Sequence, residues 1–410
     1  MAVSIGETYQ REAMALGSSV IVKRAGIGAA LIGASVLTMA AATNDQTARP
    51  QRHRQADRVT GVVDLISPRV GLVGLSAGGN SSSPARLILT TDFGRTFTSI
   101  GPKTARYSEP DSIYFLDRDH GWFATYSVLT LAETVYRTAD GGRTWRSFPA
   151  PQHNVAAGAT DSLQFLTPKL GYLTDALPTA PYESLSRTTD GGATWHLLAQ
   201  TQFGRPGHRH GLPALGKVVF QPGGKVGWLG GGMFGTALYR TGDGGRSWHK
   251  VNLRAPRGSS FGLPSITGRT VTEPVTTEWG ALGLNPRSAT LRVYTSTNDG
   301  GTWALTSKAV RVASPACQGP LATSFPAGSM PWLTAFRNGH VLAYRPAGPR
   351  SRWIGHVTPA PVPRGLCGPD SITGAGTATA WLVTASRSGN AEVIYGTRDG
   401  GRTWRRIGGA

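Results

Sequence analysis

Acidic residues that could form a catalytic pair precede several predicted strands. Glu109 and Asp111 lie in the segment EPDS, Asp161 in TDS and Asp370 in PDS, and each Asp comes directly before a Ser that begins a predicted strand. Two carboxylates about 5–10 Å apart can hydrolyse a glycosidic bond. An Asp at a strand start can also simply bond the nearby amides of the turn. We favour this second role and keep the catalytic pair as the alternative.

Other reactive residue types are scattered. His208 and His210 lie in the loop 203–211 (FGRPGHRHG), where they would need a third ligand from another loop to bind a metal, so we expect no metal there. Tyr182 and Glu183 are adjacent in a Pro-flanked segment, so their side chains need not converge. No Gly-rich phosphate loop and no Ser-His-Asp or Cys nucleophile set can be made out. The sequence therefore predicts no cofactor.

Basic residues dominate the charge of the chain. There are 42 Lys and Arg against 23 Asp and Glu, a formal net charge of +19. Such a surface attracts anions, although an Arg-rich surface can also be merely solvated. No basic segment interleaved with aromatic residues indicates nucleic-acid binding. We expect a cationic rim that binds a protein, glycan or other anionic surface, made from the loop residues Arg106, Arg205, His208, Arg209, His210, Arg254, Arg257 and Arg364.

A repeated motif defines the elements that must position these loops. It reads Thr/Ser-x-Asp-x-Gly-x-Thr/Ser-Trp/Phe and occurs at residues 90–97, 138–145, 188–195, 241–248, 297–303 (one residue short) and 397–404. Its acids are Asp92, Asp140, Asp190, Asp243, Asp299 and Asp399, and its closing aromatic residues are Phe97, Trp145, Trp195, Trp248, Trp303 and Trp404. Successive copies are roughly 50 residues apart, and a double gap before the last copy indicates one unit without the motif.

Each unit has the strand pattern of a propeller blade. The second unit shows predicted strands at 112–116, 121–125, 134–137 and 145–148, with the motif between the third and the fourth. A four-stranded blade needs about 50 residues. Six units with the motif and one silent unit around 324–357 predict an all-β, seven-bladed β-propeller of four-stranded antiparallel blades. Because every blade is contiguous in sequence, we expect the ring to close by packing alone, without an exchanged strand.

The repeated acids are predicted to be structural. Gly adopts positive φ freely, Asp bonds the amides that follow it, and Trp packs over the turn. A catalytic constellation is needed once, whereas this motif occurs six times.

The motif resembles the BNR/Asp-box repeat of sialidases, sortilin-type receptor ectodomains and photosystem II stability/assembly-factor-like propellers. The resemblance covers about residues 59–408 and implies the fold, but those relatives include both enzymes and binders. A sialidase would need an Arg triad, a Tyr–Glu pair and an acid/base Asp, and its Phe/Tyr-Arg-Ile-Pro motif does not occur here. Sialidases of this kind also have six blades. We therefore predict a non-catalytic binding or assembly scaffold, with a glycan-directed hydrolase of sialidase-like fold as the alternative.

The N-terminal segment has the pattern of an export signal. Lys23 and Arg24 precede an uncharged run over 25–42 that ends in three Ala residues. Residues 1–42 are predicted to be a helical signal peptide, or else an uncleaved membrane anchor, and 43–58 a flexible basic linker before the propeller at 59–410. We therefore expect a secreted or tethered, extracytoplasmic monomer, with association to a membrane or cell wall as a further expectation.

The cysteines add one structural expectation. Cys317 and Cys367 are one repeat apart, at equivalent points of neighbouring units. In an oxidising compartment two such thiols tend to pair. We expect a disulfide between adjacent blades, with free thiols or a metal site as the alternatives.

Overall fold

The computed structural model describes the strands and most of the turns of the region that follows residue 57. The described residues are 58–76, 83–127, 129–130, 132–151, 160–176, 182–202, 217–230, 237–257, 259–277, 289–306, 310–312, 323–324, 332–337, 340–346, 353–361, 371–376, 378–385 and 392–407. The predicted signal segment 1–42 and the linker up to residue 57 lie outside this set, as do Cys317 and Cys367. Over the described ranges, no helix has the length and apolar character needed to cross a membrane.

Seven consecutive groups of short antiparallel strands make up the fold. The first blade contains β1 (Arg58–Leu65), β2 (Gly71–Ser76), β3 (Arg86–Thr90) and β4 (Thr98–Ser99); the second β5 (Ser108–Phe115), β6 (Gly121–Ser127), β7 (Glu133–Thr138) and β8 (Arg146–Pro149); the third β9 (Thr160–Phe165), β10 (Gly171–Ala176), β11 (Tyr182–Thr188) and β12 (His196–Gln202). The fourth contains β13 (Lys217–Phe220), β14 (Gly227–Gly230), β15 (Tyr239–Thr241) and β16 (His249–Lys250).

The last three blades are less uniform. The fifth contains β17 (Ser260–Phe261), β18 (Ser265–Thr267), β19 (Thr270–Thr277), β20 (Ala289–Ser296), β21 (Ala304–Leu305) and β22 (Val310–Val312); the sixth β23 (Thr323–Ser324), β24 (Trp332–Arg337), β25 (His340–Pro346) and β26 (Trp353–Pro361); the seventh β27 (Ser371–Ala375), β28 (Thr379–Ala385), β29 (Glu392–Thr397) and β30 (Arg405–Ile407). In the fifth blade, the first-strand position is split between β17 and β18, which both pair with β19.

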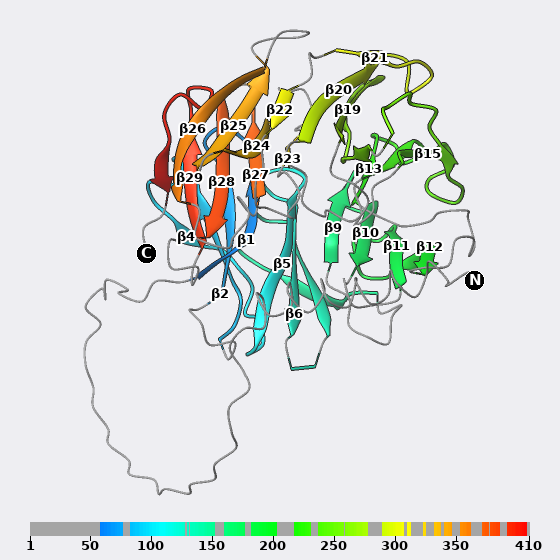
Figure 1. The fold of residues 1–410 in the computed structure, drawn as a ribbon. Helices are drawn as coiled ribbons and strands as arrows, with labels where there is room; N and C mark the ends of the chain where they lie inside the picture. Colours follow the sequence, from blue (N-terminus) through cyan, green and yellow to red (C-terminus); the bar gives the residue numbers. More distant parts are fainter. Residues whose placement is uncertain are drawn as a thin grey trace, which may run out of the picture.

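The blades are arranged as a ring, which confirms the predicted seven-bladed, all-β propeller. Figure 1 shows the first strands β1, β5, β9, β13, β23 and β27 toward the middle of the ring. Within a blade each strand pairs with the next one in sequence, as β5, β6, β7 and β8 do. In such a meander, the first and third turns of a blade lie at one end of the ring, and the second turn and the connection to the next blade lie at the other end.

Ring closure differs from the prediction. Val59 of β1 pairs with Glu392 of β29, so strands of the first and last blades form one continuous sheet. The register between β1 and β2 shifts between Val59 and Val63. A bulge of this kind bends a strand and redirects its end. The start of β1 thereby reaches Glu392 at the start of β29, before the part of β29 that pairs with β30. Pairing of main chains therefore contributes to ring closure, whereas the sequence predicted closure by packing alone.

The core consists of seams between neighbouring blades. Trp122 of β6 clusters with Leu163 and Phe165 of the third blade, and Trp332 of β24 clusters with Ile372 and Leu382 of the seventh. Fully buried aromatic residues recur at this second-strand position as Trp122, Tyr172, Trp228, Trp332 and Trp381. Five blades therefore pack an aromatic residue of the second strand at a seam, and the first and fifth blades have Leu72 and Val271 at this position.

Candidate functional site

The motif forms the third turn of each blade that carries it, and we call these turns the repeat hairpins. In the second blade, Thr138 Oγ1 donates to Asp140 Oδ1 at 2.8 Å, and the amide of Thr144 donates to the same oxygen at 2.9 Å. Thr144 Oγ1 donates to Asp140 Oδ2 at 2.6 Å. Both oxygens of this carboxylate thus accept hydrogen bonds from donors of its own turn. The same pattern recurs at Asp92, Asp190, Asp243 and Asp399.

These hydrogen bonds keep the carboxyl groups ionised. The Thr144 hydroxyl and amide lower the pKa of Asp140 to about 2, and the Thr96 amide and hydroxyl lower the pKa of Asp92. At Asp190, Asp243 and Asp399, desolvation acts in the opposite direction, but bonds from the hydroxyl and amide four residues later outweigh it and bring each pKa to about 2. An acid held in this state is unsuited to donate a proton near neutral pH.

In the fifth repeat hairpin, the motif aligns differently from the prediction. The acceptor in its turn is Asn298, whose Oδ1 accepts from Ser296 Oγ and from the amide of Thr302, both at 2.9 Å. The motif here is a full-length copy over 296–303 with Asn in the place of Asp. Asp299 instead occupies the glycine position, with φ of 55°, and accepts bonds from Gln221 and Arg269. The expectation that Asp299 braces its own turn was wrong, because the Ser at 296 was not recognised as the start.

The closing aromatic residues contact the turn and the neighbouring blade. Trp145 Nε1 donates to the carbonyl of Ile100 in the preceding blade at 2.6 Å and to Gly142 at 3.1 Å. Trp248, Trp303 and Trp404 each donate to the carbonyl three residues earlier. Trp195 Nε1 is buried without a hydrogen-bond partner, and Phe97 has no donor to offer.

Several arginines join one blade to the next. Arg137 Nη1 donates to the carbonyl of Asp190 at 3.2 Å, Arg345 Nε to Gly400 at 2.8 Å, and Arg405 Nη2 to Phe93 at 2.9 Å. Each bond runs from a strand of one blade to the repeat hairpin of the following blade. Part of the basic excess of the sequence therefore satisfies main-chain carbonyls at the seams.

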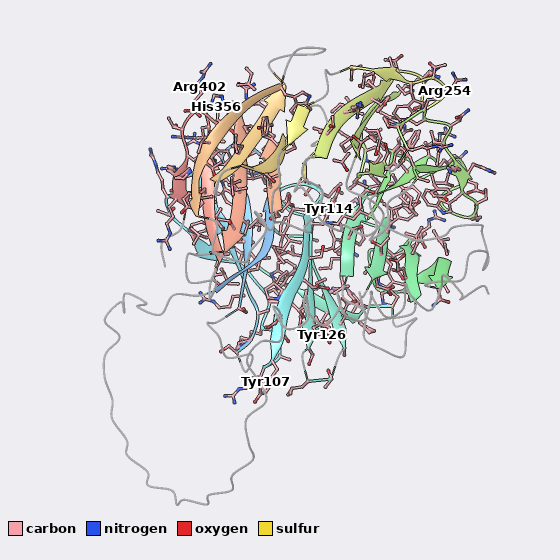
Figure 2. The ribbon with its side chains drawn as sticks, viewed as in Figure 1. Tyr107, Tyr114, Tyr126, Arg254, His356 and Arg402 are labelled. Atoms are coloured by element: carbon pink, nitrogen blue, oxygen red, sulfur yellow. The ribbon has the colours of Figure 1, made fainter. Side chains whose placement is uncertain are left out.

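The predicted cationic rim is only partly described. Arg106, Arg254 and Arg257 are exposed, in the connections before the second and fifth blades. Figure 2 places Tyr107, the neighbour of Arg106 in sequence, and Arg254 on different sides of the ring. The structure therefore does not bring these loops together. The rim residues Arg205, His208, Arg209, His210 and Arg364 lie outside the described residues.

The predicted carboxylate pair lies in strands and not in loops. Glu109 and Asp111 belong to β5, which begins at Ser108, and Asp161 belongs to β9. The register of β5 against β6 shifts between Pro110 and Ser112, so a bulge at Asp111 lets the strand begin earlier than the sequence suggested. The side chain of Asp161 and all of Asp370 lie outside the described residues.

Three acids of the second blade surround one tyrosine. Tyr126 is directly opposite Glu109 on one neighbouring strand and Glu133 on the other. Burial raises the pKa of Tyr126, and the charges of Asp111, Glu133 and Glu109 add to the shift. The side chain of Tyr126 is labelled in Figure 2.

The Tyr182 and Glu183 side chains do not converge. Both residues lie in β11, where successive side chains point to opposite faces of the sheet.

Two further acids, which the sequence did not single out, are desolvated. Desolvation raises the pKa of Asp64 in β1 to about 6, although the amides of Phe115 and Leu65 partly oppose the shift. Burial raises the pKa of Glu273 in β19 well above its usual range. Glu273 is fully buried, and no described residue makes a hydrogen bond of normal geometry to its carboxyl oxygens, although the nearby amide of Gly262 partly opposes the pKa shift. Among the described residues, no group of three or more His, Cys, Asp or Glu is arranged to hold a metal ion.

Comparison with known proteins supports the fold. No family model and no curated protein matches the chain. Among solved structures, a GH74 enzyme of Niastella koreensis has a TM-score of 0.55 at 14% identity, over 85% of this chain and 54% of that one. A prolyl endopeptidase structure has a TM-score of 0.53 at 11% identity, over 85% and 49%. The chain thus spans about half the length of these two proteins.

A third similar structure is YCF48 bound to a D1 peptide, with a TM-score of 0.44 at 18% identity, over 72% of this chain and 81% of that one. At these identities the likeness concerns the fold alone. The class that the fold defines is the seven-bladed β-propeller with four-stranded blades.

Proposed function

We propose that this protein is a non-catalytic Asp-box propeller that acts outside the cytoplasmic membrane as a binding or assembly scaffold for an anionic partner. The observation that carries the proposal is that five acids make the same hydrogen bonds within their own turns: Asp92, Asp140, Asp190, Asp243 and Asp399. Each carboxylate accepts bonds from the hydroxyl two residues before it and from the amide four residues after it. Because these five carboxylates stabilise turns, they favour the interpretation of the ring as a rigid scaffold over that of a catalytic centre.

The charge of the chain supports an anionic partner. The formal net charge is +19, and Arg106, Arg254 and Arg257 are exposed on connections between blades. Loops carried by a rigid scaffold are common binding sites. Export is supported by the charged start and uncharged run of residues 23–42, and a protein, a glycan or a charged surface would all offer the required anions.

The experiment is a quantitative pull-down from envelope extract with the full-length chain. A double Arg254→Gln, Arg257→Gln variant is compared with Arg143→Gln, Arg246→Gln, which changes two exposed arginines of repeat hairpins at the other end of the ring. We expect the first pair to lose most of the captured partner and the second to retain it, with capture decreasing as salt is raised. Equal retention by both pairs would contradict binding through these loops.

A second candidate is a glycoside hydrolase. The observation that favours it is the gathering of Glu109, Asp111 and Glu133 around Tyr126. Carboxylates that share a site can divide acid and base roles. Incubation of the full-length chain with a panel of polysaccharides tests this candidate. Turnover that is lost in Asp111→Asn and kept in Asp117→Asn would establish the hydrolase and overturn the scaffold.

A further inference from the structure

A pocket opens at the seam where the last blade meets the first. Its volume is about 370 Å³, and it is lined by Phe93, Gly396, Arg398, Asp399, Thr403, Trp404 and Arg405. Phe93 comes from the first repeat hairpin, and the other residues come from β29, the seventh repeat hairpin and β30. The pocket therefore lies at the opposite end of the ring from Arg106, Arg254 and Arg257.

Phe93 is held there in an unusual conformation. Its φ is 62°, and it occupies the position that Gly141, Gly191, Gly244 and Gly400 take in other repeat hairpins. A bulky residue with positive φ is a genuine outlier, and such strain gathers at functional sites. The side chain is also almost fully buried, with only 1% exposed. The sequence thus places an aromatic ring where the turn by itself favours glycine.

Two arginines, both with exposed side chains, lie close to the ring of Phe93. The guanidinium carbon of Arg398 is 5.2 Å from the ring centroid, and that of Arg405 is 5.1 Å from it. Cations are attracted to aromatic faces at such distances. Arg405 Nη2 also donates to the carbonyl of Phe93 at 2.9 Å, which fixes the orientation of this guanidinium.

This seam carries three arginines, Arg95, Arg398 and Arg405, and two ionised acids, Asp92 and Asp399. Burial lowers the pKa of Arg405, and the charges of Arg398 and Arg95 lower it further, against an opposing effect of Asp92. The oxygens of Asp92 are bonded to Arg95 N, Thr96 and Thr90 in its own turn. Asp399 is likewise bonded to Thr397 and Thr403. Neither Arg398 nor Arg405 takes part in the ion pairs found between described residues.

We propose that this seam pocket binds a phosphate or sulfate group between Arg398 and Arg405. Guanidinium groups match oxyanions with charge-assisted hydrogen bonds. A tetrahedral oxyanion offers acceptors in several directions and up to two negative charges, which suits two arginines that line one pocket better than a single carboxylate does. The proposal goes beyond the scaffold function and does not depend on the loops at the other end of the ring.

A purely structural role is the alternative, in which Phe93 and Arg405 only hold the first and last blades together. The two roles differ in what Arg398 does. It makes no hydrogen bond to the first blade among those found for the described residues, whereas Arg405 does. Replacing Arg398 therefore removes a ligand contact while leaving the Arg405 bond between the blades in place.

Calorimetric titration of the full-length chain with inorganic phosphate, sulfate and acetate at constant ionic strength tests the site. We expect saturable binding of phosphate and sulfate and at least about tenfold weaker binding of acetate. Glycerol phosphate and phosphatidylglycerol vesicles, run beside inorganic phosphate, distinguish a free phosphate or monoester from a lipid headgroup.

Two variants complete the test. Arg398→Gln should weaken phosphate binding about tenfold or more, because one charge-assisted contact is lost. Arg146→Gln, at the equivalent position to Arg405 in the second blade, should leave it unchanged. The thermal midpoint of each variant, measured with and without phosphate, shows that the protein is folded. Absence of saturable binding, equal binding of acetate, or an equal loss in both variants would overturn the proposal.

Discussion

Trp122 of the second blade lies flat against Phe165 of the third, with ring centroids 3.5 Å apart and planes within 4° of parallel. Its Nε1 donates to the carbonyl of Gly191 in the third repeat hairpin at 2.9 Å. Tyr172 and Phe220 repeat the arrangement one blade further on, at 3.6 Å. Trp122 thus fills the seam and also bonds the following repeat hairpin, whereas the Tyr172 hydroxyl donates to Gly224 in another turn of the fourth blade.

Replacing Trp122 should therefore destabilise the whole ring. Its side chain is fully buried, and Trp122→Ala would leave a large cavity and an unbonded carbonyl at Gly191. We expect the free energy of unfolding to fall by about 3–5 kcal/mol. Urea denaturation followed by fluorescence measures it. Leu129→Ala, at a side chain 65% exposed, serves as the control and should change little. A loss at Trp122 as small as that of the control would contradict the packing role.

The folded protein should lose stability in acid, because the acids of the repeat hairpins become protonated. The folded pKa values of Asp140, Asp190, Asp243 and Asp399 are about 2, below the usual value of 3.8. Their contribution is therefore complete above about pH 4 and is lost as the pH falls toward 2. The thermal midpoint should decrease over this window. Asp190→Asn should make the decrease shallower, whereas Asn298→Ala, in the hairpin that has no carboxylate acceptor, should lower the midpoint without changing its slope against pH.

Asp64 predicts an opposite effect at higher pH. Its folded pKa is raised to about 6, so the folded state holds this proton more tightly than the unfolded state does. Stability should decrease as the pH rises from about 4 to 6, by up to about 3 kcal/mol for a shift of two pKa units. Asp64→Asn should remove this decrease in urea unfolding at pH 4, 5, 6 and 7. A decrease that persists in the variant would show that another group is responsible.

Glu273 should be a destabilising residue at neutral pH. It is fully buried, and desolvation raises its pKa well above the usual range, with only a partial opposing effect of the Gly262 amide. Glu273→Leu, similar in size and without a polar group, should raise the free energy of unfolding at pH 7 by about 1–3 kcal/mol. Glu273→Gln, which keeps an unbonded polar group, should gain less. A large destabilisation by both variants would mean that the Glu273 carboxyl group makes a stabilising interaction in the folded state.

Much of the fold was predictable because it repeats. The spacing of the Asp hairpins fixed the number of blades, and the silent sixth blade was visible as the double gap between Asp299 and Asp399. The fifth hairpin was misaligned because Asn298 replaces the expected acid, and only its bonds to Ser296 and Thr302 reveal the substitution. The seam aromatic residues were overlooked, although a signal existed in the recurring second-strand pairs Gly121-Trp122 and Gly227-Trp228.

The candidate sites were less predictable. Sequence analysis grouped Arg106 with Arg254 because both precede a first strand, but Tyr107, which follows Arg106 in sequence, and Arg254 lie on different sides of the ring (Figure 2). It placed Glu109 and Asp111 in a loop because it could not foresee the bulge that extends β5. Arg398 in the last motif and Arg405 directly after it were not singled out, since Phe93 is about 300 positions away from both in the chain.

By itself, the sequence determined the class of fold, the number of blades and the turn chemistry of the repeat hairpins, because these depend on short-range patterns that recur. Tertiary structure alone decided how β1 joins β29, which acids lose their water and which arginines meet over Phe93. These features arise where the two ends of the chain come together or where neighbouring blades face each other. Such contacts join residues far apart in sequence, and no local pattern encodes them.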